Sequence, residues 1–294
     1  MNSFKIEKIL VPIDFSETSM LAIEHAGFIA QTFNAELILL HVVEKHWEKF
    51  NIVVPELRVN APDDLINAVE RRLEEISASI HTKYGVKSNC ITANGHVFSE
   101  INSISDEREV DLIVMGTHGT SGFVEHFVGS TTYKVVTHSE CPVISVQVHS
   151  DKLGFKDILL PIDDSSHSRQ KVSHAIVMAK HFNAKIHVVG LANTHNEADL
   201  EKFDIKLEKI EEFIRSQHLS CNRELLVGTN QATMTSECAK AIKADLIIIM
   251  TDQEENITGR LMGTFAQQII NTSKIPVMSI RPVVSAGTNF SLYN

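Results

Sequence analysis

The feature that most constrains this 294-residue chain is an internal repeat. The segment KIEKILVPIDFSETS, which begins at Lys5, returns as GFKDILLPIDDSSHS, which begins at Gly154. An offset of 149 residues relates these segments, and it also relates FNAELILLHVV, from Phe33, to FNAKIHVVGLA, from Phe182. Further along, the offset falls to 134, where DLIVM from Asp111 matches DLIII from Asp245. A repeat of this length predicts two tandem domains of the same fold.

The change of offset, 149 − 134 = 15, gives the first copy about 15 additional residues within Glu44–Asp64, a stretch that holds the only tryptophan, Trp47. We interpret this insertion as a surface loop, with a lid over a ligand as the alternative. The expected boundaries are 1–149 for the first domain, 154–284 for the second, and 285–294 for a poorly ordered tail. Because the connection is short, the two domains are expected to pack closely, through a pseudo-two-fold interface like that of a homodimer.

Each copy alternates apolar strand patterns with amphipathic helix patterns. Strands are expected at Ile9–Ile13, Glu36–Val43, Leu112–Met115 and Val143–Val148. Helices are expected after the N-cap Ser16, from Asp63 or Asp64, and after Gly129. The apolar stripes of the long helices are Ile66, Val69, Leu73, Ile76 and Ile80 in the first copy and Leu200, Phe203, Leu207, Ile210 and Ile214 in the second. The alternation predicts an α/β fold with two doubly wound parallel sheets, in which ligands bind at the carboxyl ends of the strands where the strand order reverses.

Composition narrows the partners and the compartment. The net charge of −10 disfavours nucleic acid and an anionic membrane as the main partner. No apolar run approaches the roughly 20 residues that cross a bilayer, and the first residues lack the order of a secretory signal, so a cytoplasmic location is expected. The four cysteines have no C-x-x-C spacing and are expected to be reduced core thiols, and the 15 histidines show no metal-binding spacing.

The segment from Met115 to Thr131 carries the strongest chemical signal. It follows a buried strand and leads into a helix, and its leading glycines, Gly116 and Gly119, are expected to supply the positive φ angles and close backbone approach of an anion-binding turn. Gly129, Ser130 and Thr131 open the next helix, where free N–H groups and the helix dipole favour phosphate. A glycine-rich turn with an ordinary helix cap is the alternative, and the complete pattern after a strand outweighs it.

The pattern Gly116-x2-Gly119-x9-Gly129-Ser130 resembles the ATP-binding signature of the universal stress protein (UspA) family. The segments KILVPIDFSE, LLHV at Leu39–Val42 and CPVISV from Cys141 are similar to that family's first, second and fifth strands. The resemblance covers nearly the whole chain and implies a Rossmann-like, adenine nucleotide alpha hydrolase-like fold. It implies ATP as the ligand, with or without Mg²⁺. The site residues that it implies are Pro12, Ile13 and Asp14 along the adenosine, the backbone of Val42 at the adenine, and Met115, Gly116, His118, Gly119, Gly129, Ser130 and Thr131 at the phosphates. Asp14 has a turn-capping role as its alternative, and His118 that of a solvent-facing loop residue.

The second copy departs from this pattern. Met250 is followed by a loop without the two leading glycines, and Asp252, Glu254 and Glu255 stand where phosphates would lie. Carboxylates repel a triphosphate. We therefore expect the second domain to be a structural or regulatory partner that binds no ATP, with a metal-bridged anion or a different ligand as the alternative.

Three functions remain open on the sequence. The first is a nucleotide-dependent stress-response or regulatory module with ATP in the N-terminal domain. The second is a slow Mg²⁺-dependent nucleotide hydrolase, for which His118 and Glu125 are the nearby water-activating candidates. The third is a scaffold that binds no nucleotide. No catalytic residue is identified, and the expected partners are an adenine nucleotide and the other domain of the chain, with homodimerisation left open.

Overall fold

The computed structural model describes residues 4–44, 62–117, 128–148, 150–165, 167–251, 253–256 and 259–282. Several residues named above lie outside these ranges: Trp47 with most of the insertion, His118, Gly119, Glu125, Asp252 and the C-terminal tail. Within the described ranges, no helix combines the length and apolar character that crossing a bilayer requires.

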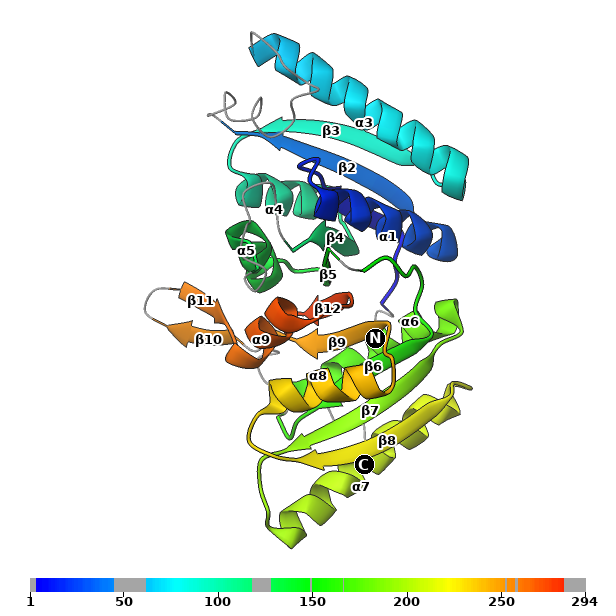
Figure 1. The fold of residues 1–294 in the computed structure, drawn as a ribbon, viewed down its shortest axis with the longest axis vertical. Helices are drawn as coiled ribbons and strands as arrows, with labels where there is room; N and C mark the ends of the chain where they lie inside the picture. The colour runs from blue at the N-terminus through cyan, green and yellow to red at the C-terminus, as the bar shows by residue number, and fades with distance from the viewer. Residues whose placement is uncertain are drawn as a thin grey trace.

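The first domain alternates strands and helices as predicted (Figure 1). Its elements are β1 (Lys8–Pro12), α1 (Glu17–Phe33), β2 (Glu36–Val43), α3 (Pro62–Tyr84), β3 (Ser88–Asn94), α4 (Val97–Glu107), β4 (Leu112–Gly116), α5 (Ser130–His138) and β5 (Val143–Val146). Ser16 caps α1, and its side chain accepts a hydrogen bond from the backbone N–H of Ser19. The stripe predicted on α3 is wrong at one position, because Leu65 is buried while Ile66 is half-buried.

The second domain repeats the order with one added hairpin. Its elements are β6 (Asp157–Ile162), the short 3₁₀ helix η3 (Ser168–Lys171), α6 (Val172–Phe182), β7 (Lys185–Ala192), α7 (Glu197–Ser216), β8 (Cys221–Val227), α8 (Gln231–Ala241), β9 (Leu246–Met250), β10 (Gln253–Asn256), β11 (Gly259–Met262), α9 (Thr264–Thr272) and β12 (Val277–Ile280). The hairpin β10–β11 occupies the segment that the sequence analysis treated as a loop.

The strands of both domains form a single ten-stranded sheet in the order β3-β2-β1-β4-β5-β12-β9-β6-β7-β8. Within each domain neighbouring strands are parallel, and the domains meet where β12 pairs antiparallel with β5. Figure 1 shows this seam at the middle of the molecule, with the first domain above it and the second below. The close packing predicted from the short connection therefore takes the form of one continuous sheet.

Two apolar layers cover the faces of this sheet. Residues of α1, α3, α6 and α7 pack on one face, and residues of α4, α5, α8 and α9 pack on the other. The central strands are buried on both faces, as in Ile9, Leu10 and Val11 of β1. In each domain the strand order reverses between the first strand and its neighbour, β1 beside β4 and β6 beside β9. That position is where a doubly wound sheet offers a crevice to a ligand.

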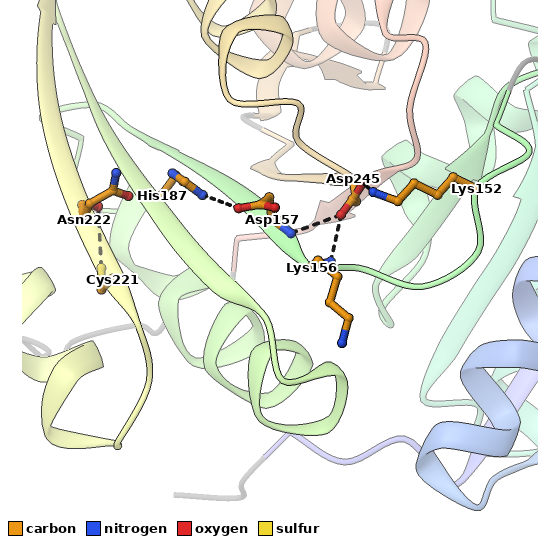
Figure 2. Close-up of polar contacts among 7 residues, drawn as sticks. All are labelled: Lys152, Lys156, Asp157, His187, Cys221, Asn222 and Asp245. Atoms are coloured by element: carbon orange, nitrogen blue, oxygen red, sulfur yellow. Dashed lines mark hydrogen bonds and ion pairs between the residues drawn. The ribbon is translucent and has the colours of Figure 1, made fainter.

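The connecting segment is fastened to the second domain by Asp245, directly before β9 (Figure 2). Its Oδ2 atom accepts hydrogen bonds from the backbone N–H groups of Lys156, at 2.8 Å, and Asp157, at 3.1 Å, while Oδ1 pairs with the ammonium of Lys152. Asp111 is the equivalent residue of the first domain, and its Oδ2 atom accepts hydrogen bonds from the backbone N–H groups of Glu7 and Lys8. The repeated aspartate therefore ties the entrance of the first strand to that of the fourth in both domains.

Candidate nucleotide site of the first domain

The carboxyl ends of β1 and β4 lie side by side, because the two strands are paired from Ile9–Leu112 onward. This pairing places Pro12, Ile13 and Asp14 beside Met115 and Gly116, although about 100 residues separate them in the sequence. Val42 lies on β2 beyond the last residue pair that β2 forms with β1, Pro12–Leu40. The structure thus gathers the described residues of the predicted site at the reversal of strand order.

The turn after β1 is held by local contacts. Oδ1 of Asp14 accepts hydrogen bonds from the backbone N–H of Ser16, at 3.0 Å, and from its hydroxyl, at 2.5 Å. This is the turn-capping role that the sequence analysis kept as the alternative for Asp14. The next residue, Phe15, has a φ of 63°, a left-handed conformation that costs a bulky side chain about 1–3 kcal/mol.

His41 supports this turn from below, a role that the sequence analysis missed. Its Nδ1 atom lies 2.7 Å from the carbonyl oxygen of Ile13, and its ring lies against the ring of Phe15 at a centroid distance of 5.0 Å. Burial lowers the pKa of His41 from its ordinary value, which favours the neutral ring as donor of this hydrogen bond. The LLHV segment places His41 next to Val42 in the sequence, but only the fold brings its ring against the turn after β1.

The glycine at the end of β4 is required by close packing. A Cβ atom built on Gly116 would lie 2.8 Å from Cβ and 2.9 Å from the backbone carbon of Thr18 in α1. The predicted positive φ is wrong for Gly116, because this residue is the last of a β-strand and is not among the residues with positive φ. The close contact that requires a glycine here is with helix α1, whereas the approach of this backbone to an anion stays a prediction.

Two hydrogen bonds bring the start of α5 back to the end of β4. The backbone N–H of Gly129 donates to the carbonyl oxygen of Thr117 at 2.8 Å, and the hydroxyl of Thr132 donates to the carbonyl oxygen of Gly116 at 3.0 Å. Gly129 is the N-cap of α5, as predicted, with φ −56° and ψ 147°. Since its own N–H is engaged, the donors that α5 offers at this end are the amides of its first turn, which includes Ser130 and Thr131.

The corresponding end of the second domain differs at several positions, including one each at the fourth strand, the last helix and the first helix. Met250 takes the place of Gly116, Ala266 that of Thr132, and Lys171 that of Ala22 in α1. Lys171 is 3% exposed, and its ammonium donates to the hydroxyl of Ser168 at 3.1 Å. A helix also starts later there, since the 3₁₀ turn Ser168–Lys171 precedes α6. The side chains of Glu254 and Glu255 lie outside the described set, so the predicted acidic loop is described only as the backbone of β10.

Among the described residues, no group of three or more histidine, cysteine, aspartate or glutamate side chains is arranged to hold a metal ion. All four cysteines are free, and Cys221 and Cys238 are buried. The prediction of a core thiol is wrong for Cys90, which lies exposed on the edge strand β3.

Comparisons with known proteins agree with the two-domain fold. The sequence profile of the Universal stress protein family matches residues 5–147 and, a second time, residues 154–281. The chain belongs to the universal stress protein family, in a tandem two-domain arrangement.

Individual relatives show the same division. Universal stress protein MJ0531 of Methanocaldococcus jannaschii is 31% identical over 153 residues, which are 48% of this chain and 82% of that protein. A universal stress protein of Mycolicibacterium smegmatis is 23% identical over 291 residues, covering 93% of this chain and 97% of the relative. The crystal structure of a universal stress protein from Archaeoglobus fulgidus superposes with a TM-score of 0.73 at 20% identity, covering 96% of this chain and 99% of the other, which shows the shared fold.

Proposed function

We propose that the first domain binds ATP at the carboxyl ends of β1 and β4 and that the protein acts as a nucleotide-dependent regulatory module of the stress response. Adenosine lies over the ends of β1 and β2, along Pro12, Ile13 and Asp14 and against the backbone of Val42. The phosphates lie at the start of α5, held by Gly129, Ser130 and Thr131 together with Met115, Gly116, His118 and Gly119. The second domain binds no ATP.

The observation that carries the proposal is the closed strand–turn–helix unit of the first domain. The hydrogen bond from Gly129 to Thr117 joins the two ends of the turn, and Thr132 fastens the first turn of α5 to Gly116. The start of α5 is thereby fixed at the crevice, and the amides and dipole of its first turn favour a phosphate there. The second domain lacks the equivalent of the Thr132 hydroxyl, because Ala266 stands at that position.

The strained turn after β1 supports the adenosine half of the proposal. Phe15 keeps a left-handed backbone next to Asp14, and buried His41 holds the carbonyl of Ile13. Strained backbone of this kind concentrates at ligand-binding sites, where the surrounding structure maintains it. The cytoplasmic location, and the presence of Mg²⁺ with the nucleotide, remain predictions from the sequence.

The test is a pair of matched substitutions at the two helix N-caps. Gly129 and Gly263 have nearly the same conformation, with φ, ψ of −56°, 147° and −58°, 148°, and aspartate is a favoured N-cap residue. A Cβ atom at Gly129 would lie 3.3 Å from the carbonyl oxygen of Thr117, which a shift of a few tenths of an ångström accommodates, so Gly129→Asp should keep the fold while it places a carboxylate beside the proposed phosphates. Charge repulsion of about 1–4 kcal/mol predicts a loss of ATP affinity of about fivefold or more.

Isothermal titration calorimetry of the full chain measures this effect. The expected result is one ATP bound per wild-type chain, weak binding to the Gly129→Asp variant and unchanged binding to the Gly263→Asp variant. Equal ATP affinity in wild type and Gly129→Asp would refute the site. A loss of binding in Gly263→Asp alone would move the site to the second domain.

A further inference from the structure

Two hydrogen bonds cross the seam between the domains next to the helix N-caps. The backbone N–H of Val128 donates to Oδ1 of Asn271 in α9 at 2.8 Å, and the backbone N–H of Met262 donates to the hydroxyl oxygen of Tyr133 in α5 at 3.2 Å. Val128 and Met262 are equivalent residues of the repeat, since 128 + 134 = 262, and each stands directly before its N-cap glycine. Each domain therefore supplies a side chain that fixes the residue before the other domain's N-cap glycine.

The two bonds differ in what they hold. The bond from Val128 fixes the end of the turn that leads into the N-cap Gly129, at the proposed phosphate site. The bond from Met262 fixes the end of β11, the second strand of the hairpin β10–β11 in the second domain. Asn271 and Tyr133 are also not equivalent in the repeat, because Thr137 corresponds to Asn271 and Gln267 to Tyr133. The second domain thus contributes its own amide side chain to the turn of the first.

The seam also contains buried polar side chains. Gln147 follows β5 and Ser279 lies on β12, and both are buried. Neither polar atom of the Gln147 side chain, and not the Ser279 hydroxyl, has a hydrogen-bond partner within the described ranges. Incompletely paired polar groups weaken an interface relative to apolar packing. Hydrogen bonds across the seam, such as that between Val128 and Asn271, then contribute to the docking of one domain on the other.

We propose that Asn271 of the second domain is a positioning residue for the phosphate-binding turn of the first, so that nucleotide affinity depends on the docking of the second domain. The inference rests on the proposed function. Because Val128 is held by a side chain outside its own domain, displacement of α9 releases the turn and lowers affinity for the phosphates. By linkage, a nucleotide bound in the first domain strengthens the docking of α9 by the same factor.

The experiment compares ATP with adenosine in the full chain. Asn271→Ala removes the acceptor at a half-buried position, and its matched control, Tyr133→Phe, removes the equivalent acceptor for Met262. The expected result is ATP affinity about 3- to 10-fold weaker in Asn271→Ala, the worth of one neutral hydrogen bond. Adenosine, which lacks the phosphates, keeps its affinity in this variant. Tyr133→Phe keeps both affinities within about twofold, since its bond lies away from the turn.

A second measurement needs no nucleotide. Residue-resolved amide exchange by NMR follows the Val128 N–H, which is expected to exchange faster in Asn271→Ala and at the wild-type rate in Tyr133→Phe. Wild-type ATP affinity in Asn271→Ala would overturn the inference and leave the proposed function in place. Equal weakening of ATP and adenosine, or the same weakening in Tyr133→Phe, would also overturn it, because the effect would then be a general loss of docking. No ATP binding by the wild-type chain would refute the proposed function and the inference together.

Discussion

The two domains share a strand order but differ where the first helix packs against the carboxyl end of the fourth strand, which is β4 in the first domain and β9 in the second. In the first domain Gly116 lets α1 begin against β4, and α1 runs for 17 residues from its N-cap Ser16. In the second domain Met250 fills the equivalent position, and the helix begins as a 3₁₀ turn before the 11 residues of α6. A side chain at this position excludes a helix start at the same distance. The comparison teaches that a glycine at this position allows the first helix to approach the ligand end of the sheet closely.

The same comparison separates what is structural from what is functional in the repeat. The aspartate pair Asp111 and Asp245 and the turn residues Asp14 and Asp163 make similar local hydrogen bonds in both domains. The first domain alone has the glycine at the end of β4, the hydroxyl of Thr132 and His41. In the second domain the equivalent residues are Met250, Ala266 and Gly190. The retained residues maintain the fold, and the lost residues gather at the proposed nucleotide site.

The largest effect on stability is expected from the repeated aspartates. Asp245→Ala removes two hydrogen bonds from backbone N–H groups and the ion pair of Lys152, at a side chain that is 4% exposed, and should lower the free energy of unfolding by about 3 kcal/mol. Asp111→Ala should cost less, about 2 kcal/mol, because its site is more exposed. Urea denaturation of both variants measures the difference. A larger loss in Asp111→Ala would show that the hydrogen bonds of Asp111 and Asp245 are not equivalent in the two domains.

A smaller loss is expected when the first domain is made more like the second at β4. Gly116→Ala places a Cβ atom 2.9 Å from the backbone carbon of Thr18, and backbone cannot move aside as a side-chain tip can. Overpacking of this kind should cost about 2 kcal/mol and displace the start of α1. Thermal and urea denaturation report the loss, and unchanged stability would show that close approach of α1 does not require this glycine.

The smallest effect concerns the equivalent histidines His25 and His174. Burial lowers the pKa of both, and that of His174 to about 4. The unfolded chain then binds the proton more tightly than the folded chain, so the stability contribution is complete above pH 6.5 and is lost as the pH falls toward 4. In His174→Gln the loss of unfolding free energy between pH 8 and pH 6 should be smaller by about 1 kcal/mol.

Urea denaturation at the two pH values, with each protein referred to its own stability at pH 8, gives this difference. A loss in His174→Gln as large as that of the wild type would show that this ring does not carry the acid sensitivity. His25→Gln is the matched variant in the first domain. There Nε2 of His25 lies 2.6 Å from the carbonyl oxygen of Ser150, whereas the ring of His174 lies tilted against the ring of Phe4 at a centroid distance of 4.4 Å.

Local patterns in the sequence predicted most of the elements. The strand Glu36–Val43 and the N-cap at Ser16 agree with the structure, because apolar runs and capping residues act within a few neighbouring positions. The hairpin β10–β11 was missed, because Gln253–Asn256 is polar and carries no strand pattern. Ile66 was preferred to Leu65 because both fit a helical stripe, and only the sheet beneath α3 selects between them.

The sequence by itself determined the repeat, the order of strands and helices, and the family. The repeat and the order of elements follow from periodicity and spacing along the chain, and the family follows from the resemblance of its motifs. Only the tertiary structure decided that β5 pairs with β12, that Thr18 is the reason for Gly116, and that Asn271 reaches the turn of the other domain. Hydrogen bonds and packing contacts between distant segments depend on which surfaces meet when the sheet is assembled, and residue types at either end do not specify the partner.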